Sequence, residues 1–342
     1  MNEMFSDRTI SSATKPARLG FFGVGWIGRH RMEAIVSSGA GKAVAIADAS
    51  PEMVEEAKKL APDAVIVNGL EELLGLDLDG IVIATPSAQH AAQSIQVLEA
   101  GTAVFCQKPL GRNEKEVEDT VAAARNANRL LGVDLSYRYT QGMQQIRDLS
   151  RSAELGHIYA VDLVFHNAYG PDKPWFYDKT LSGGGCVMDL GIHLADLALW
   201  ALDFPAIDKV TSQLFHQGQR ISGRSDQVED FATATIELSS GTVVRLTCSW
   251  RLQAGCDAII GASFYGTGGG AEMRNVNGSF YDFIAQRYRG TSSEVLVEPP
   301  EDWGGRAATD WARKLSEGAR FDPRCSEYVR TASLIDDIYR AA

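Results

Sequence analysis

The sequence predicts two domains: a doubly wound α/β domain with a mostly parallel sheet, followed by an α+β domain with a large open antiparallel or mixed sheet. The length of 342 residues suits two domains of ordinary size. Up to about Tyr137, short apolar runs alternate with helical stretches, and longer strands with regular alternation follow. We therefore expect a flexible arm at 1–17, the first domain at 18–136 and the second at 137–342.

Six short runs rich in Val, Ile and Phe are the expected strands of the first domain. They cover residues 19–22, 43–47, 64–67, 80–84, 102–106 and 130–135. Helices fill the gaps between them. The clearest is 51–60, where Ser50 takes the N-cap position and Pro51 the first helical position. This alternation of strand and helix is typical of a parallel sheet.

The second domain is predicted from one clear pair of strands and three helices. Residues 229–238 and 242–250 alternate apolar and polar side chains with a period of two, and a Ser-Ser-Gly turn joins them. This pattern indicates an antiparallel pair with one wetter face. The helices are expected at 186–202, 306–317 and 326–340.

Composition and charge exclude several classes of protein. The net charge of -11 and the pI near 5.1 argue against a nucleic-acid partner, because phosphate binding needs clustered Lys and Arg. No apolar run approaches the roughly 20 residues that a membrane span needs, and the first seventeen residues do not resemble a secretion signal. The five cysteines lack the paired spacing of a zinc site or a disulfide framework, which favours reduced thiols in a cytoplasmic protein.

A glycine motif follows the first expected strand and opens a helix. In Gly23-Val24-Gly25-Trp26-Ile27-Gly28 the first glycine permits a tight turn, the second lets the backbone approach a pyrophosphate, and the third allows close packing of helix on strand. The phosphates would meet free N–H groups at the positive end of the helix. A glycine-rich turn that merely joins strand to helix is the alternative, and its context argues against it.

Asp48 ends the second expected strand, 20 residues after Gly28. At this spacing a carboxylate accepts hydrogen bonds from the adenosine ribose of a bound dinucleotide. A carboxylate also repels a 2′-phosphate, and the neighbouring Ala49 and Ser50 offer no arginine to bind one. The sequence therefore predicts NAD in preference to NADP.

The turn after the fourth expected strand is a second candidate segment for cofactor binding. It reads Ala84-Thr85-Pro86-Ser87-Ala88-Gln89-His90 and lies at the carboxyl end of that strand, where ligands of open α/β sheets bind. A plain strand-to-helix turn with Ser87 as the helix cap is the alternative interpretation.

The fifth expected strand ends in Cys106-Gln107-Lys108-Pro109, which brings a lysine to the sheet edge that carries the glycine loop. An isolated lysine is usually a solvated surface charge. Beside a substrate oxygen, however, a cation stabilises the alkoxide that develops as hydride leaves the carbon. Lys108 is therefore a candidate catalytic residue.

Three polar residues lie on the helix expected at 186–202, which follows Gly183-Gly184-Gly185. Asp189, His193 and Asp196 are spaced by four and three residues, so they are predicted to share one face toward a polar cleft. His193 suits a general base, and Asp189 would position its imidazole or share the proton. A surface pair on an amphipathic helix and a metal site are the alternatives, although no third metal ligand lies nearby in sequence.

Together these motifs resemble the glucose-fructose oxidoreductase and inositol dehydrogenase (Gfo/Idh/MocA) family, over nearly the whole chain from Arg18. The resemblance implies a Rossmann dinucleotide-binding fold and an NAD(P)-dependent dehydrogenase that acts on CH–OH groups. It assigns the catalytic trio Lys108, Asp189 and His193, with the nicotinamide beside Lys108. The implied cofactor-binding residues are Gly23, Gly25, Trp26, Ile27, Gly28, Asp48, Ala84, Thr85, Pro86, His90, Gln107 and Lys108. The implied substrate-binding residues are Lys108, Arg138, Asn167, Tyr169, Trp175, Asp189 and His193.

Several of these assignments have structural alternatives. Arg138 equally fits a cation at a helix entry, and the aromatic residues equally fit packing. One position departs from the family: many members have Glu before the Lys-Pro dipeptide, and this chain has Gln107. Charge is lost there while shape is kept, which bears on how Lys108 is held.

We therefore expect reversible hydride transfer between NAD and a secondary alcohol of a sugar, inositol or related polyol. A cleft lined by Asp189, Asp196, Arg138 and Asn167 favours a polyhydroxylated substrate. The alternatives are a non-catalytic regulatory protein that binds dinucleotide and sugar, and a reductase or group-transfer enzyme with tightly held cofactor. The resemblance and the open sheet also suggest a homo-oligomer, a dimer or tetramer, through the sheet face.

Overall fold

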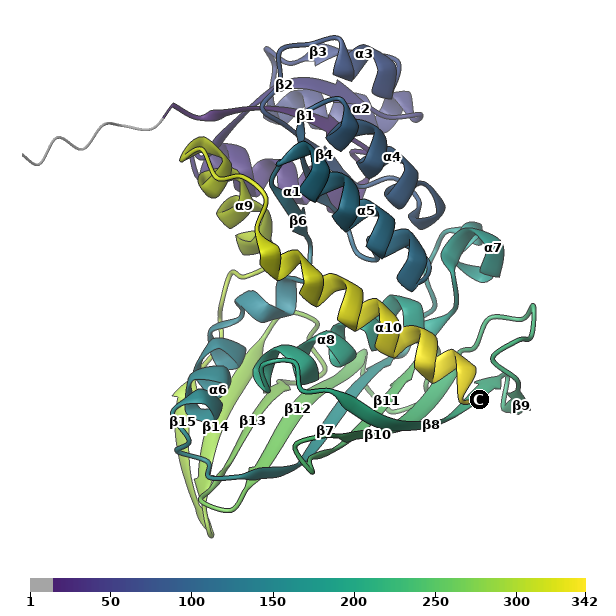
Figure 1. The fold of residues 1–342 in the computed structure, drawn as a ribbon, viewed down its shortest axis with the longest axis vertical. Coiled ribbons are helices and arrows are strands. Elements are labelled where there is room, and N and C mark those ends of the chain that lie inside the picture. The colour runs from purple at the N-terminus through teal and green to yellow at the C-terminus, as the bar shows by residue number, and fades with distance from the viewer. Residues whose placement is uncertain (1–14) are drawn as a thin grey trace, which may run out of the picture.

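The computed structural model describes residues 15–342 and contains two sheets, one toward each end of the molecule, with helices between them (Figure 1). The expected arm at 1–17 lies almost wholly outside the described residues, and strand β1 begins at Ala17. The division of the remaining chain at residue 136 stays a prediction.

The first sheet has six parallel strands in the order β3-β2-β1-β4-β5-β6. Successive strands are added in one direction from β1 to β3 and in the opposite direction from β4 to β6. This change of strand order between β1 and β4 opens a crevice at the carboxyl ends of these two strands. All six strands match expected positions, so the doubly wound fold is confirmed. Their bounds are β1 Ala17–Phe22, β2 Gly41–Ala47, β3 Val65–Ile66, β4 Gly80–Ile83, β5 Ala103–Cys106 and β6 Leu131–Val133.

Helices connect the strands of the first sheet on both of its faces. The cap expected for α2 is present, because the Ser50 hydroxyl accepts a hydrogen bond from the Met53 amide at 3.4 Å. The bounds are α1 Trp26–Ser37, α2 Pro51–Leu60, α3 Leu70–Leu74, α4 Ser87–Glu99 and α5 Glu114–Ala127.

The second sheet is mixed and has nine strands in the order β15-β14-β13-β12-β7-β11-β10-β8-β9. Strands β7 and β11 pair in parallel, whereas the other neighbours are antiparallel. The expected hairpin is confirmed as β10 and β11. The bounds are β7 Ile158–Asn167, β8 Ile207–His216, β9 Gln219–Ile221, β10 Phe231–Leu238, β11 Val243–Ser249, β12 Ala258–Gly266, β13 Gly270–Asn275, β14 Phe283–Arg289 and β15 Ser292–Val297.

The two carboxyl-terminal helices pack on the domains in different ways. Helix α9 (Arg306–Ser316) packs on the first sheet, where Trp311 fills the space left by Gly80 and Gly132. A Cβ atom at either glycine would lie within 2.7 Å of the Trp311 ring. Helix α10 (Ser326–Arg340) packs against α5 of the first domain and against helix α8 (Ile192–Ala201) of the second (Figure 1). Helix α10 therefore contacts both domains and holds them together.

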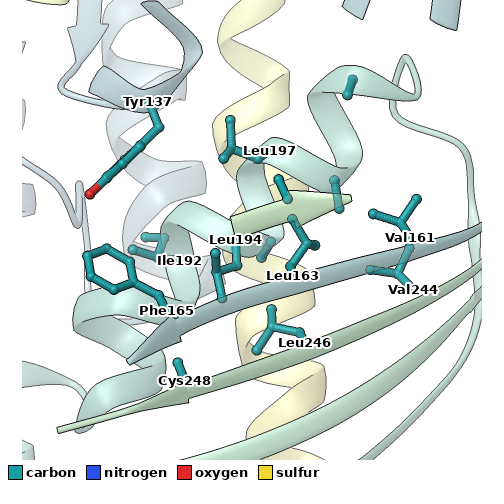
Figure 2. Close-up of a cluster of buried hydrophobic side chains, with 14 of the residues drawn as sticks. Tyr137, Val161, Leu163, Phe165, Ile192, Leu194, Leu197, Val244, Leu246 and Cys248 are labelled. Atoms are coloured by element: carbon teal, nitrogen blue, oxygen red, sulfur yellow. The ribbon is translucent and has the colours of Figure 1, made fainter. Parts of the chain in front are cut away.

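The helix expected at 186–202 differs from a regular α-helix. A π-helical turn at Val187–Gly191 precedes α8 (Ile192–Ala201), and every residue of α8 is buried, with its leucines packed on β7 and β11 (Figure 2). The expectation that one side of this helix faces a polar cleft holds for Asp189 and His193, which line the cleft, but not for Asp196. A π-helical turn also changes the angular spacing of side chains.

The remaining α-helices of the described residues are α6 Gln141–Arg151 and the short α7 Lys179–Ser182. Among residues 15–342, no helix combines the length and apolar character that crossing a membrane requires.

Candidate active site

A cleft of about 1550 Å³ lies at the carboxyl edge of the first sheet, against the second domain. Its walls include the glycine loop, the turn after β4 and the end of β5, together with Asp189 and His193 of the second domain. Pockets for one small ligand usually measure about 300–1,000 Å³. The cleft is therefore large enough for a dinucleotide and a second molecule.

The glycine loop has the geometry that pyrophosphate binding requires. Gly23 has a φ of +85°, and a Cβ there would lie 2.5 Å from the Ala84 carbonyl oxygen. A Cβ at Gly28 would lie 2.1 Å from the Gly23 oxygen, whereas nothing lies within 4 Å of one at Gly25. Backbone and ligand can therefore approach closely at Gly25, beside the amino-terminal end of α1.

Asp48 lies on the cleft at the end of β2, as its spacing predicts. One carboxylate oxygen accepts a hydrogen bond from the Val24 amide at 2.7 Å, and the other accepts one from the Ser50 amide at 2.8 Å. These two bonds fix the carboxylate beside the glycine loop. Each oxygen keeps lone pairs that a ribose hydroxyl can use.

The turn after β4 is tied to the segment that carries Lys108. The two ring nitrogens of His90 lie 2.7 Å from the Pro109 carbonyl oxygen and 2.6 Å from that of Thr85. His90 is almost completely buried. It therefore holds two cofactor-facing loops at a fixed separation.

Lys108 and Asp189 form an ion pair across the cleft, between the first domain and the second. The Lys108 Nζ donates to the Asp189 Oδ1 at 2.7 Å and to the Asp189 carbonyl oxygen at 2.7 Å. An ammonium has three N–H donors, so one remains free to reach a substrate oxygen. The Trp250 indole N–H donates to the other oxygen of Asp189 at 3.1 Å and fixes the carboxylate.

His193 lies on the cleft next to this pair. Its imidazole packs edge-on against Tyr137, with ring centroids 4.9 Å apart, and makes no hydrogen bond to any residue of the described part of the chain. Burial, and after it the positive charges of Lys108 and Arg31, holds the pKa of His193 well below its ordinary value of 6.5. A neutral imidazole that faces the cleft can accept a proton from a hydroxyl group.

Glu229 holds the loop that leads to Asp189. Its Oε1 accepts hydrogen bonds from the Gly185 amide at 2.9 Å, the Val187 amide at 2.9 Å and the Tyr339 hydroxyl at 2.8 Å. A Cβ at Gly185 would lie 1.9 Å from the Glu229 carbonyl oxygen, which explains a glycine there. Burial raises the pKa of Glu229.

Two walls border the space beyond His193. On one wall, Trp175 stacks on Phe176 with ring centroids 3.8 Å apart, and Phe176 in turn contacts Trp250. On the other wall, the ring of Trp303 packs against that of Tyr137, with ring centroids 4.9 Å apart. This end of the cleft is therefore aromatic, with Asp172, Lys173, Glu301 and Asp302 at its border.

The structure brings most of the predicted site residues to the cleft. Gly28 instead lies behind the loop, where it allows helix α1 to pack closely. Those on the cleft are Gly23, Gly25, Trp26, Ile27, Asp48, Ala84, Thr85, Pro86, His90, Gln107, Lys108, Trp175, Asp189 and His193.

Arg138 and Asp196 do not line the cleft, contrary to expectation. The Arg138 guanidinium donates to the two carboxylate oxygens of Asp196 at 2.7 and 2.5 Å and to Glu327 at 2.6 Å. Both side chains of this pair are buried between helices. The π-helical turn separates Asp196 from Asp189, so the shared face that we predicted is wrong.

Asn167 and Tyr169 also lie outside the cleft lining. The Asn167 Oδ1 accepts a hydrogen bond from the Tyr169 amide at 2.7 Å, and the exposed Tyr169 hydroxyl donates to Asp257 at 2.6 Å. Both residues therefore shape the loop after β7, and of the three residues predicted in this segment only Trp175 lines the cleft.

Our sequence reasoning missed Arg31, Asp134, Glu229 and Trp250. A signal was available for Asp134, because it directly follows β6 at the same sheet edge as Lys108. Arg31 lies on α1, close after the glycine motif. Glu229 and Trp250 reach the site only through long-range packing, which leaves no local pattern. Residues 15–342 contain no group of three or more His, Cys, Asp or Glu side chains that could hold a metal ion.

Two family models match this chain. Residues 17–135 match the model described as the oxidoreductase family, NAD-binding Rossmann fold, and residues 143–272 match the GFO/IDH/MocA C-terminal domain. The chain belongs to the GFO/IDH/MocA family. It is therefore an oxidoreductase with an NAD-binding Rossmann domain, and the glycine loop described above fits that cofactor.

Known relatives include enzymes of sugars and inositols. D-glucoside 3-dehydrogenase of Escherichia coli (strain K12) is 28% identical over 235 residues, which cover 66% of this chain and 64% of that protein. Inositol 2-dehydrogenase 4 of Saccharopolyspora erythraea is 24% identical over 306 residues, 86% of each chain. KijD10, a 3-ketoreductase from Actinomadura kijaniata solved with NADP and TDP-benzene, has a TM-score of 0.81 at 22% identity, covering 96% of this chain and 98% of its own. That likeness shows the fold alone.

Proposed function

We propose that the protein is an NAD-dependent dehydrogenase that moves a hydride between the nicotinamide and a secondary alcohol of a sugar, inositol or related polyol. The observation that carries this proposal is the meeting of Lys108 from the first domain with Asp189 and His193 from the second, on one cleft. The relatives named for a glucoside and an inositol support the same substrate class.

The three side chains have distinct roles in this proposal. His193 accepts the hydroxyl proton of the substrate through a ring nitrogen. The free N–H of Lys108 donates to the same oxygen and stabilises its developing negative charge. Asp189 holds the ammonium in place, and Trp250 holds Asp189. Bound NAD supplies the hydride acceptor.

The charges around the cleft favour an uncharged substrate. Each of these cations is already paired with a carboxylate: Lys108 with Asp189, Lys173 with Asp172, Arg306 with Glu301, and Arg31 with Asp134. Asp302 is exposed on the same cleft and forms no ion pair with any described residue. Arg29 lines the cleft without an ion pair to any described residue, but it directly follows the glycine motif, at the end of the cleft where the dinucleotide phosphates are expected. A nucleoside diphosphate as substrate would need further free Arg or Lys side chains. The KijD10 structure with TDP-benzene therefore does not predict this chain's substrate.

A spectrophotometric assay of NADH formation tests the proposal. We expect turnover with a methyl glucoside or myo-inositol, weak turnover with UDP-glucose, and a preference for NAD over NADP because Asp48 repels a 2′-phosphate. Tight NAD binding without reduction by any sugar or polyol would contradict the dehydrogenase proposal. A clear NADP preference would contradict the role of Asp48 alone.

We further infer a cytoplasmic homo-oligomer, a dimer or tetramer, that associates through the open face of the second sheet. Val243 and Tyr265 flank Ala160 across the strand register and are partly exposed, as is Ile259 on the same face. Apolar side chains grouped on a sheet face support association. The five cysteines, none of them in a disulfide, support a reducing compartment.

A further inference from the structure

The residue before Lys108 is a glutamine, and its surroundings favour a neutral hydrogen-bond donor over a carboxylate at this position. Gln107 directly follows β5, and Asp134 directly follows the neighbouring strand β6. The Gln107 amide Nε2 donates to the Asp134 Oδ2 at 2.7 Å. The Arg31 Nε donates to the same oxygen at 2.6 Å. One carboxylate therefore joins a residue of the cleft to a cation of helix α1.

This cluster lies in the interior. The Asp134 side chain has no exposed surface and that of Arg31 is 7% exposed. The second Asp134 oxygen is buried and accepts no hydrogen bond from any described residue. Burying a carboxylate and a guanidinium is costly unless they neutralise each other. The cluster accommodates one negative charge opposite one positive charge.

The orientation of the Gln107 carboxamide follows from this charge balance. Its NH2 group faces the Asp134 carboxylate, so its oxygen must face the other way, where it accepts a hydrogen bond from the Lys108 amide at 3.0 Å. Asp134 therefore orients Gln107, and Gln107 orients the backbone from which the Lys108 side chain extends.

We propose that Asp134 positions Lys108 for the reaction through Gln107. This inference rests on the proposed dehydrogenase activity. Asp134 and Gln107 are positioning residues, because neither accepts the hydroxyl proton of the substrate and neither donates the N–H that stabilises the alkoxide. The residue at 107 must donate a hydrogen bond to Asp134.

Gln107→Glu breaks this requirement in a pH-dependent way. The introduced carboxylate would face the Asp134 Oδ2 at about the distance of the present amide, and two carboxylates that close share a proton. When protonated, the introduced acid donates to Asp134 as the amide does. When ionised, it repels Asp134. The charged or titratable groups around position 107 are Asp134 on the β6 side, Arg31 and its neighbour His30 on α1, and Lys108 on its own segment.

The test compares kcat/KM of Gln107→Glu and of the unaltered enzyme between about pH 5 and about pH 9. We expect the ratio of the two values to lie near one at the acid end and to fall by at least about tenfold at the alkaline end. Gln96→Glu is the matched control, because the Gln96 amide also donates to a carboxylate, Glu71, at 2.6 Å, but on the exposed surface. Its ratio should stay constant.

A second variant gives readouts that do not depend on turnover. Asp134→Asn leaves Arg31 buried without its anion, so we expect a lower unfolding temperature. Adding Asp134→Asn to Gln107→Glu restores one carboxylate opposite Arg31. In the unaltered protein the Asp134 Oδ2 accepts hydrogen bonds from both Arg31 and Gln107, and the double variant reproduces this arrangement less well. We expect the double variant to exceed the product of the two single effects on kcat/KM by at least about fivefold.

Three results would overturn the inference: a pH-independent ratio for Gln107→Glu, strictly multiplicative effects in the double variant, or an unchanged unfolding temperature for Asp134→Asn. The proposed function fails separately, when the unaltered protein binds NAD and reduces it with no sugar or polyol. In that case the unfolding temperatures of the four proteins and their NAD affinities still test the charge balance among Arg31, Gln107 and Asp134.

Discussion

Two ion pairs hold the same helical segment, and their surroundings differ. Asp189 pairs with Lys108, and both side chains are 18% exposed toward the cleft. Asp196, seven residues later, pairs with Arg138, and these side chains are only 2% and 11% exposed. Both carboxylates bind a cation from an earlier part of the chain. Only the first pair borders space for a substrate.

The exposure of the two cations and their contact with the cleft distinguish the two pairs in function. Arg138 uses three of its nitrogens on Asp196 and Glu327 and also packs over Trp200 and Phe204, so it has no free face for a ligand. Lys108 keeps one N–H free. A partly exposed ion pair with a free donor on the cleft suits chemistry, whereas a buried pair away from the cleft holds the helices α8 and α10 together.

The largest expected effect follows from removing the cation of the first pair. Lys108→Met should lower kcat by about 10² to 10⁴-fold, because the developing alkoxide loses its stabilising donor. NAD affinity, measured by calorimetry, should stay within a few-fold of the original value. Near-normal turnover in this variant would show that the two pairs do not differ in the way described.

Local pattern was enough to predict much of the molecule. The glycine loop, Asp48 and the Ser50 cap depend on residues within one strand-turn-helix unit, and each lies where the sequence indicates. Lys108 could be placed because the ends of parallel strands share one sheet edge. Short-range rules are sufficient wherever a single unit fixes the geometry.

The roles of Asp189 and Asp196 could not be separated in this way. Regular helical spacing predicts one common face, and the π-helical turn between Gly185 and Ile192 breaks that rule without a recognisable sequence signal. Each partner is also distant: Glu327 lies 189 residues from Arg138. Only tertiary packing determines which carboxylate meets which cation.

The second effect is on stability and concerns the buried pair. Arg138→Met should reduce the free energy of unfolding by about 3–5 kcal/mol, because Asp196 is left buried without a cation. Urea denaturation measures this loss. Turnover of the folded fraction should change far less than in Lys108→Met.

A double variant sharpens this distinction. Arg138→Met combined with Asp196→Leu replaces both charges by apolar groups, so it should recover much of the lost stability. If the double variant is as unstable as the single one, an unpaired charge is not the cause. If Arg138→Met instead abolishes turnover in fully folded protein, Arg138 takes part in the reaction.

A smaller effect concerns Trp250, which contacts the first ion pair but not the second. Trp250→Phe keeps the ring volume approximately but removes the N–H that holds the Asp189 carboxylate at 3.1 Å. A neutral donor to a charged acceptor contributes about 1.5 kcal/mol or more, so kcat/KM should fall by about tenfold. The loss should appear in kcat more than in KM if the bond positions Asp189 and, through it, Lys108. An unchanged kcat would assign Trp250 to packing alone.

The smallest expected change is in the pH dependence of activity, where the charges of the first pair act on His193. A general base must be neutral, and burial together with Lys108 and Arg31 holds the pKa of His193 well below 6.5. An imidazole with the ordinary pKa would be about three-quarters protonated at pH 6. We therefore expect kcat/KM to fall by less than about twofold between pH 7.5 and pH 6, and a fall of about fourfold would contradict the depressed pKa.

The lowered pKa of His193 also has a defined sign for stability: below pH 6.5 the unfolded chain binds a proton at this imidazole that the folded chain does not. The free energy of unfolding should then fall on acidification, by at most about 1.4 kcal/mol per pH unit for this one group. His193→Asn should remove that part of the slope, which separates it from the contributions of the other buried groups.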